Sequence, residues 1–186
     1  GGVRVLDAPV SGGTGGAEDA TLCVMVGGDR DTYDEFKTVL DLIGDKVMYC
    51  GDRGAGAVCK IVNNLIGLAT GVLLSEAFTL GIKAGVDAET LFTAVAGSSG
   101  NTQAMQGLPN GIFKRNFDPG FQLDLAAKDV GLATQLGREL RVPMEMSNTA
   151  QQRYITAQNE GWGRLAAGAV ARIQEQRAGV EIAPPE

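Results

Sequence analysis

The feature that most constrains the fold is a long segment, residues 54–83, whose apolar side chains are not confined to one helical face. A helix that is apolar all round is normally buried by its neighbours. About 30 residues at roughly 1.5 Å each span about 45 Å. The sequence therefore predicts one long buried helix at the centre of a helical domain. Its longest apolar stretch, residues 65–74, is about half of what a membrane-spanning helix needs, so we expect a soluble protein.

The residues before this segment follow a different pattern, in which β-rich runs alternate with a helical period. The expected elements are strands at 3–10, 22–26 and 46–50, a glycine-rich loop at 11–20, and a helix capped by Asp29 or Asp31 that ends near Ile43. This order favours a sheet with helical cover. Later helices are expected at 87–96, 123–140, 144–158 and 164–176, and residues 178–186 are expected to fray. We predict an α+β fold that is mainly α, with domains at 1–52 and 53–186.

The composition excludes several kinds of chemistry. The 186 residues include no histidine, which rules out a Ser-His-Asp triad and a histidine-bound metal. A net charge of −6 without a basic cluster argues against nucleic-acid binding. The three cysteines are too few and too scattered for a zinc site or a disulfide framework, so we expect no metal and a reducing, cytoplasmic location without a signal peptide or membrane anchor. Acid–base chemistry is left to lysine, carboxylate, tyrosine or cysteine.

Two segments offer polar groups for a small carboxylate. Ser11-Gly12-Gly13 follows an expected strand, and its hydroxyl and backbone N–H groups could bind an anion, although a plain turn at a sheet edge has the same pattern. Lys60 and Asn64 are four residues apart, so they share one face of the long helix. An ammonium and an amide there could hold a substrate oxygen and exchange a proton with it. The alternative is a lysine that reaches solvent and an asparagine that satisfies a core partner.

A third segment, residues 118–129, places Lys128 beside Asp129 near the start of an amphipathic helix. This pair could meet a cofactor or a substrate, but ordinary surface charges fit equally well. Gly54-Ala55-Gly56 superficially matches a dinucleotide-binding fingerprint, because it follows a strand and opens a helix. Cys59 stands at the third glycine position, however, and no further strand follows. We expect these glycines to allow close packing.

Together, five segments in this order resemble the β-hydroxyacid dehydrogenase family, which includes 3-hydroxyisobutyrate dehydrogenase and tartronate semialdehyde reductase. The segments are DAPVSGG at 7–13, MVGG at 25–28, GAGAVCKIVNN at 54–64, SSG at 98–100 and FDPGFQLDLAAKD at 117–129. The resemblance covers nearly the whole chain. It implies the last part of a Rossmann-type sheet, then a long buried helix and an all-helical domain like the C-terminal domain of 6-phosphogluconate dehydrogenase.

The resemblance also implies a reaction and a set of roles. Such enzymes pass a hydride between NAD or NADP and a small 3-hydroxy acid or the matching semialdehyde. Lys60 matches the catalytic lysine and Ser11-Gly12-Gly13 the carboxylate-binding turn. The other matches are Asn64, Phe121 and Asp129 on the substrate side and Lys128 at the cofactor. The family further implies a homodimer or homotetramer built on the helical part.

The sequence departs from the family in two places. The complete GxGxxG loop and the first βα units are absent, so we expect the chain alone to be inactive, and the choice between NAD and NADP stays open. Residues 160–166 also differ from the family's usual acidic and small polar pair, which leaves one wall of the substrate pocket undefined.

Two other functions remain as alternatives. A phosphogluconate-type decarboxylating dehydrogenase would need a cluster of basic residues, which the sequence lacks. A non-catalytic helical oligomerisation module would also suit the long apolar helix. The presence of Lys60 excludes the imine-reductase-like relatives, which replace that lysine.

Overall fold

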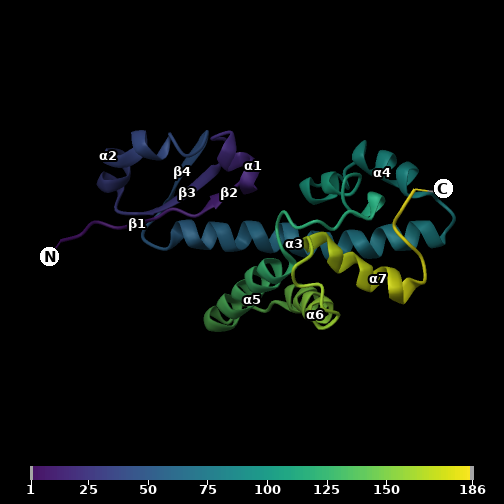
Figure 1. Ribbon diagram of the computed structural model, residues 1–186. Helices are drawn as coiled ribbons and strands as arrows, with labels where there is room; N and C mark the ends of the chain where they lie inside the picture. The colour runs from purple at the N-terminus through teal and green to yellow at the C-terminus, as the bar shows by residue number, and fades with distance from the viewer. Residues whose placement is uncertain (1, 185–186) are drawn as a thin grey trace. The chain divides into compact units, whose positions relative to one another are not determined.

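The computed structural model describes residues 2–184, and the chain divides into two compact units, Gly1–Asn63 and Asn64–Glu186. Helix α3 (Ala55–Lys83) begins in the first unit and continues through the second (Figure 1). Helices predominate over a small sheet, so the predicted fold class, α+β and mainly α, is confirmed.

The first unit is built on a sheet, in which the described residues form four strands. They are β1 (Leu6–Asp7), β2 (Val10–Ser11), β3 (Cys23–Gly28) and β4 (Lys46–Gly51). Strands β1 and β2 pair antiparallel with one edge of β3, and β4 runs parallel to its other edge. The prediction of a single strand at 3–10 is wrong, because Ala8 and Pro9 form no strand and separate β1 from β2. Proline has no N–H for the ladder, although the Pro9 carbonyl accepts from the Met25 N–H at 2.9 Å.

The glycine-rich segment 11–20 was expected to be a loop, and this prediction is wrong. It contains a short helix, α1 (Gly13–Glu18). The backbone enters the helix through Gly12 with φ of 139°, a conformation that favours glycine. A Cβ added at Gly12 would lie 2.9 Å from Leu22 Cδ2, and one added at Gly16 would lie 3.1 Å from the same atom. Packing against Leu22 therefore stabilises a helix that the sequence, rich in glycine, does not favour by itself.

Helix α2 (Arg30–Leu40) covers one face of the sheet, and its start is set by a side-chain cap. The Asp29 carboxylate accepts from the Thr32 N–H at 2.8 Å, which confirms Asp29 as the capping residue. Alternate residues of β3, Val24 and Val26, pack against Tyr33 and Leu40 of this helix. The odd-numbered residues of β3 therefore face the other side of the sheet.

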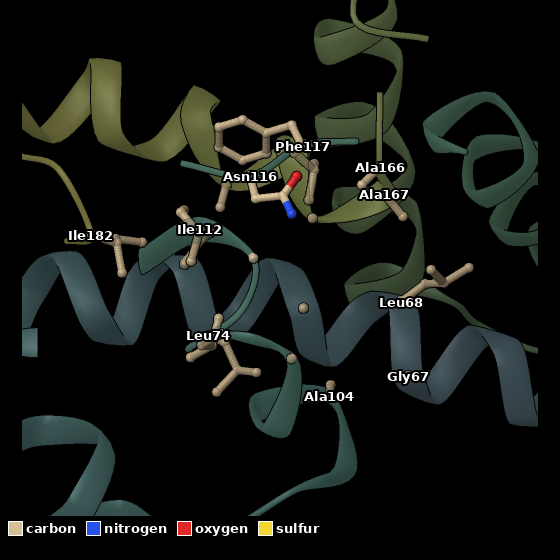
Figure 2. A pocket seen from close by; sticks show the side chains of 18 of the residues that line it. Gly67, Leu68, Leu74, Ala104, Ile112, Asn116, Phe117, Ala166, Ala167 and Ile182 are labelled. Atoms are coloured by element: carbon tan, nitrogen blue, oxygen red, sulfur yellow. The ribbon is translucent and has the colours of Figure 1, made fainter. Parts of the chain in front are cut away.

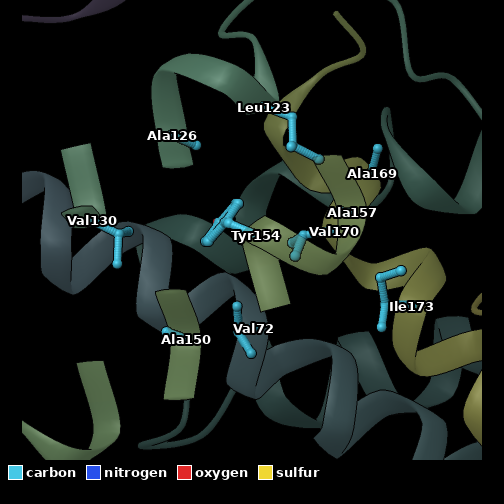
Figure 3. Close-up of a cluster of buried hydrophobic side chains, with 10 residues drawn as sticks. All are labelled: Val72, Leu123, Ala126, Val130, Ala150, Tyr154, Ala157, Ala169, Val170 and Ile173. Atoms are coloured by element: carbon cyan, nitrogen blue, oxygen red, sulfur yellow. The ribbon is translucent and has the colours of Figure 1, made fainter. Parts of the chain in front are cut away.

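The second unit is helical in its described residues. After α3 come α4 (Ala88–Ala96), η1 (Gln103–Gly107), η2 (Ile112–Lys114), α5 (Leu123–Leu140), α6 (Glu145–Asn159), η3 (Ala167–Val170) and α7 (Ala171–Ala178). Two apolar clusters hold them together. Figure 3 shows one of them, in which Val72 of α3 meets residues of α5, α6, η3 and α7 around the buried Tyr154. The other joins Phe78 of α3 to α4, η1, η2 and Ile182.

The end of the chain differs from the sequence-based expectation in two ways. The helix expected at 164–176 begins later, because residues 164–166 form no helix and η3 precedes α7. The tail was expected to fray from residue 178, but Ile182 is buried and its N–H donates to the Glu175 carboxylate at 2.7 Å. That contact anchors the tail, and residues 185 and 186 lie outside the described part of the chain.

The long helix is less buried than its composition suggested. Ile66, Leu73 and Leu80 have exposed fractions of 62, 58 and 72%. Helix α3 is long and apolar enough to cross a membrane, but the core helix of a soluble protein can be equally long and apolar. Here Tyr154 of α6 donates to the Leu68 carbonyl at 3.1 Å and Arg153 bridges to Glu76 at 3.2 Å. These contacts make α3 the core helix of the second unit.

Candidate active site

The first turn of α3 is anchored to the sheet by the carboxylate of Asp7. This side chain accepts from the Gly54 N–H at 2.6 Å and from the Ala57 N–H at 2.9 Å. A carboxylate at a helix N-terminus satisfies otherwise unpaired N–H groups and meets the positive end of the helix dipole. Burial by itself raises the pKa of Asp7, but these backbone N–H donors outweigh that effect and hold the pKa below its usual value. Asp7 therefore acts as a cap supplied from 47 residues earlier in the chain.

The glycines of this turn allow close packing, as the sequence suggested. A Cβ added at Gly56 would lie 2.2 Å from the Met25 carbonyl oxygen and 2.8 Å from Asp7 Oδ2. One added at Gly27 of β3 would lie 2.6 Å from Asp7 Oδ1. Side chains at these positions would push helix, strand and carboxylate apart. Since Asp7 already takes the N–H groups of Gly54 and Ala57, this helix end does not hold a phosphate.

Lys60 and Asn64 follow directly on this anchored turn. Both side chains are partly buried, and their spacing of four residues places them on the same face of α3. The Asn64 amide donates to Asp129 Oδ2 of α5 at 2.6 Å. Because the amide NH2 donates to a carboxylate, the amide oxygen of Asn64 has a defined direction.

Asp129 also meets the second lysine of the predicted site. Its side chain is only 15% exposed and forms an ion pair of 3.0 Å with Lys128, whose side chain is 60% exposed. Phe121 lies just before α5, with an exposed ring, and its carbonyl accepts from the Ala167 N–H at 2.8 Å. The structure thus brings Asn64, Asp129 and Lys128 together. The bond between Asn64 and Asp129 joins two candidates that lie 65 positions apart, and no local pattern signals it.

Ser11-Gly12-Gly13 lies in the first unit, at the end of β2. Ser11 is partly buried and pairs with Cys23 across the sheet. Gly12 and Gly13 are exposed and have φ of 139° and 67°. Positive φ at two successive glycines turns the chain sharply from strand into helix α1.

Residues 160–166, where the sequence departs from the family, serve packing in this structure. A Cβ added at Gly163 would lie 2.4 Å from Asp124 Oδ1, and the Asp124 N–H donates to the Gly163 carbonyl at 2.9 Å. The Arg172 guanidinium stacks over the Trp162 ring, 4.1 Å from its centroid. This segment therefore holds the start of α5 against the turn that leads to η3.

The second unit also contains an apolar hollow of about 300 Å³ (Figure 2). It lies beside the middle of α3, at Gly67, and is bounded by Ala104, Ile112 and Ala167 of the surrounding segments. The hollow has few polar groups, and the Tyr154 hydroxyl is already used by Leu68. It therefore offers no acid–base chemistry. Among residues 2–184, no group of three or more cysteine or carboxylate side chains is placed to bind a metal ion.

Sheet, long helix and helical domain together define the class of oxidoreductases that pair a dinucleotide-binding domain with a helical domain. Two family descriptions match the chain. Residues 54–173 match the "NAD-binding" domain of NADP-dependent 3-hydroxyisobutyrate dehydrogenase, and residues 1–51 match the NAD-binding domain of 6-phosphogluconate dehydrogenase. The chain belongs to the β-hydroxyacid dehydrogenase family, whose cofactor is NAD or NADP.

Individual relatives agree with this assignment. The chain is 40% identical to 2-(hydroxymethyl)glutarate dehydrogenase of Eubacterium barkeri over 97% of its own length and 60% of the relative's. It is 33% identical to 2-hydroxy-3-oxopropionate reductase of Escherichia coli, over 96% of the chain and 61% of the relative. Among solved structures, Mycobacterium tuberculosis 3-hydroxyisobutyrate dehydrogenase with L-serine superimposes with a TM-score of 0.83 at 34% identity, covering 90% of this chain and 60% of that one. The chain thus spans about 60% of the length of these relatives.

Proposed function

We propose that this chain is the substrate-side, catalytic-lysine half of an NAD(P)-dependent dehydrogenase for a small 3-hydroxy acid or the corresponding semialdehyde. The observation that carries the proposal is the placement of Lys60 and Asn64 on one face of α3, directly after the turn that Asp7 anchors. A proton carrier must be held in a fixed position to act on a substrate oxygen. The cap at Asp7 and the bond from Asn64 to Asp129 supply that rigidity on two sides of Lys60.

Each site residue has a proposed role. Lys60 takes a proton from the substrate hydroxyl during oxidation and returns one to the carbonyl oxygen during reduction. Ser11-Gly12-Gly13 binds the carboxylate through its hydroxyl and backbone N–H groups. Asn64 holds the reacting oxygen, while Asp129 fixes the Asn64 amide and lines the substrate site together with Phe121.

The described residues supply part of what a dinucleotide needs. When bound, NAD or NADP supplies the carbon that accepts or donates the hydride. Lys128 is the proposed contact to the cofactor, since most of its side chain is exposed while Asp129 holds it in place. The pyrophosphate requires N–H groups other than those of Gly54 and Ala57, which Asp7 already occupies. We therefore expect the chain alone to bind the cofactor weakly and to be inactive.

Relatives support the substrate class. One relative is named 2-(hydroxymethyl)glutarate dehydrogenase, and the structure of another was solved with L-serine. In both compounds a hydroxymethyl group is attached to the carbon that carries a carboxylate, which makes each a 3-hydroxy acid. A carboxylate-binding turn and a proton carrier for the hydroxyl meet the two requirements of such a substrate.

The organisation of the protein is proposed on similar grounds. The two family matches meet between residues 51 and 54, which supports a domain boundary near residue 52. We propose a homodimer or homotetramer built on the helical part, because the exposed apolar residues Ile66, Leu73 and Leu80 lie on α3. We also propose a soluble, cytoplasmic protein, because the bacterial relatives are dehydrogenases and reductases.

The test measures turnover after the chain is joined to the dinucleotide-binding segment of the Escherichia coli relative. NADH or NADPH formation is followed with L-serine, 3-hydroxyisobutyrate and 2-(hydroxymethyl)glutarate. Lys60→Ala should lower kcat by about 10²- to 10⁴-fold, the range for loss of a general acid–base group. Lys83→Ala, at the exposed end of the same helix, is the matched control and should keep full activity. Turnover in Lys60→Ala equal to that of the parent would reject the proposed role.

A binding measurement on the chain alone tests the same proposed site. Titration of the isotope-labelled chain with 3-hydroxyisobutyrate should shift the amide signals of Gly12 and Gly13 and the side-chain amide of Asn64. Isobutyrate, which lacks the hydroxyl, should shift the glycine signals and leave Asn64 nearly unchanged. Shifts confined to other residues would contradict the proposed binding turn.

A second candidate function is a helical oligomerisation module without catalysis, favoured by the exposed apolar side chains of α3. The substitution Leu73→Glu should convert oligomer to monomer in sedimentation experiments. If oligomers form but no 3-hydroxy acid shifts the signals of Gly12, Gly13 or Asn64, this second function replaces the first.

A further inference from the structure

The three cysteines of the chain all lie in the first unit, on β3, β4 and the first turns of α3. Residues of a strand alternate between the two faces of its sheet. Val47 and Tyr49 of β4 face the cluster that contains α2. The alternation stops there, because Val26 pairs with Tyr49 and Gly27 with Gly51, which leaves Cys50 as the extra residue of a β-bulge at the end of β4. The start of α3 packs closely against the neighbouring strand β3, where a Cβ added at Gly56 would lie 2.2 Å from the Met25 carbonyl oxygen.

The face of α3 that carries Cys59 is turned toward the end of β4. A Cβ added at Gly51, the last residue of β4, would lie 3.3 Å from Ala55 Cβ. Cys59 is four residues after Ala55, so it occupies the same helical face, and helical side chains lean back toward the N-terminus. Cys59 therefore lies on the face of α3 that is turned toward the end of β4, where Cys50 directly precedes Gly51.

The two thiols differ in environment. Cys59 is exposed and Cys50 is partly buried. Burial raises the pKa of Cys50, and a hydrogen bond to the Cys59 thiol together with the charge that Cys59 can carry raises it further. The two thiols therefore lie close enough to influence each other, and the exposed Cys59 is the more accessible of the two to a reagent in solution.

We propose that Cys50 and Cys59 form an oxidisable pair, in which a low-molecular-weight disulfide such as oxidised glutathione converts the two thiols into a reversible disulfide bond. The exposed Cys59 thiolate attacks one sulfur of the small disulfide, which forms a mixed disulfide and releases one small thiol. The Cys50 sulfur then attacks the Cys59 sulfur and releases the second small thiol. The protein loses two protons and two electrons, and the small disulfide gains both.

The bond would act on the residue next to it in the chain. A disulfide requires Cβ atoms about 3.8 Å apart, so its formation draws the first turns of α3 onto the end of β4. Lys60 follows Cys59 directly and must move with it. The expected consequence, a reversible loss of turnover on oxidation, rests on the proposed function of Lys60, whereas formation of the bond does not.

The test is peptide mapping without reductant after equilibration of the chain in glutathione buffers of increasing oxidised fraction. Trypsin cleaves after Lys46, Arg53 and Lys60, so Cys50 and Cys59 fall in separate peptides, 47–53 and 54–60, while Cys23 falls in 5–30. The expected result is a linked pair of 47–53 and 54–60 that dithiothreitol separates. Glutathione that stays on Cys59 without any linked pair, or a link that involves 5–30, would overturn the proposal.

Serine variants assign the order of the two steps. Cys50→Ser should stop the reaction at the glutathione adduct of Cys59, and Cys59→Ser should abolish both the adduct and the link. Cys23→Ser is the matched control and should leave the link intact. Circular dichroism of each variant checks the fold, which a change from sulfur to oxygen at an exposed or partly buried position should preserve. An adduct on Cys50 in Cys59→Ser, formed as fast as the Cys59 adduct in the parent, would contradict the assigned order.

Discussion

Substitution of Asp7 by asparagine tests whether a distant carboxylate holds the start of α3. The carboxylate accepts from the Gly54 and Ala57 N–H groups at 2.6 and 2.9 Å. Asparagine keeps one oxygen and turns an NH2 group toward the other donor, so one N–H loses its partner and the negative charge is lost. Loss of a helix cap costs about 1 kcal/mol, and up to about 2 kcal/mol in protein hosts. We therefore expect Asp7→Asn to lower the free energy of local unfolding by about 1–2 kcal/mol, with the effect confined to the first turn of α3.

The assay is hydrogen exchange of backbone amides. A loss of about 1–2 kcal/mol corresponds to exchange roughly 5- to 30-fold faster. The effect should be confined to residues 54–60, and Asp45→Asn, which removes the same charge from an exposed bend, should leave these rates unchanged. Unchanged exchange at Gly54 and Ala57 in Asp7→Asn would refute the capping argument, as would equal acceleration in both variants.

The stabilisation that Asp7 provides should also depend on pH, in a direction that follows from its lowered pKa. Because the folded protein lowers the pKa of Asp7, its stabilising contribution is fully present above the unfolded value of about 3.9. That contribution is lost as the pH falls from there through the lower folded value. The difference between the parent and Asp7→Asn should therefore be constant near neutral pH and shrink below about pH 4.

Two further substitutions test the packing of α3. Tyr154→Phe removes the hydroxyl that donates to the Leu68 carbonyl at 3.1 Å and should lower the free energy of unfolding by about 1 kcal/mol in urea denaturation, with no change if the bond contributes nothing. Gly56→Ala forces a Cβ to within 2.2 Å of the Met25 carbonyl oxygen and should destabilise by about 1–3 kcal/mol. The control is Gly67→Ala in the same helix, where an added Cβ meets nothing within 4 Å, and it should stabilise by roughly 0.5–1 kcal/mol. Equal effects at the two glycines, measured by thermal unfolding, would contradict the packing argument.

Local patterns in the sequence predicted the elements whose stability is local. The caps at Asp29 and Asp87 lie three residues before the N–H groups that they bind, and both appear in the structure at 2.8 and 2.9 Å. The bounds of α3 and α5 follow from long helical periods and from the turns that end them. The strand at 22–26 was recognised because β-rich residues end at a glycine pair.

The sequence names candidate site residues but does not specify how they are arranged. The resemblance named Lys60, Asn64, Asp129 and Lys128, and the structure adds that Asn64 donates to Asp129 and that Asp129 pairs with Lys128. Pairs between distant segments depend on how helices pack, which a periodic pattern does not specify. The same limit applies to Cys50 and Cys59, which looked scattered in the sequence.

The sequence by itself determined the class of fold, the position of the long helix and the family, because periodicity, caps and five ordered motifs are read along the chain. The tertiary structure alone decided three things: that Asp7 caps α3, that a glycine-rich segment forms α1 against Leu22, and that Glu175 anchors the tail at Ile182. In each case the stabilising partner lies in another element. A contact of that kind exists only after the chain has folded, so local propensity cannot predict it.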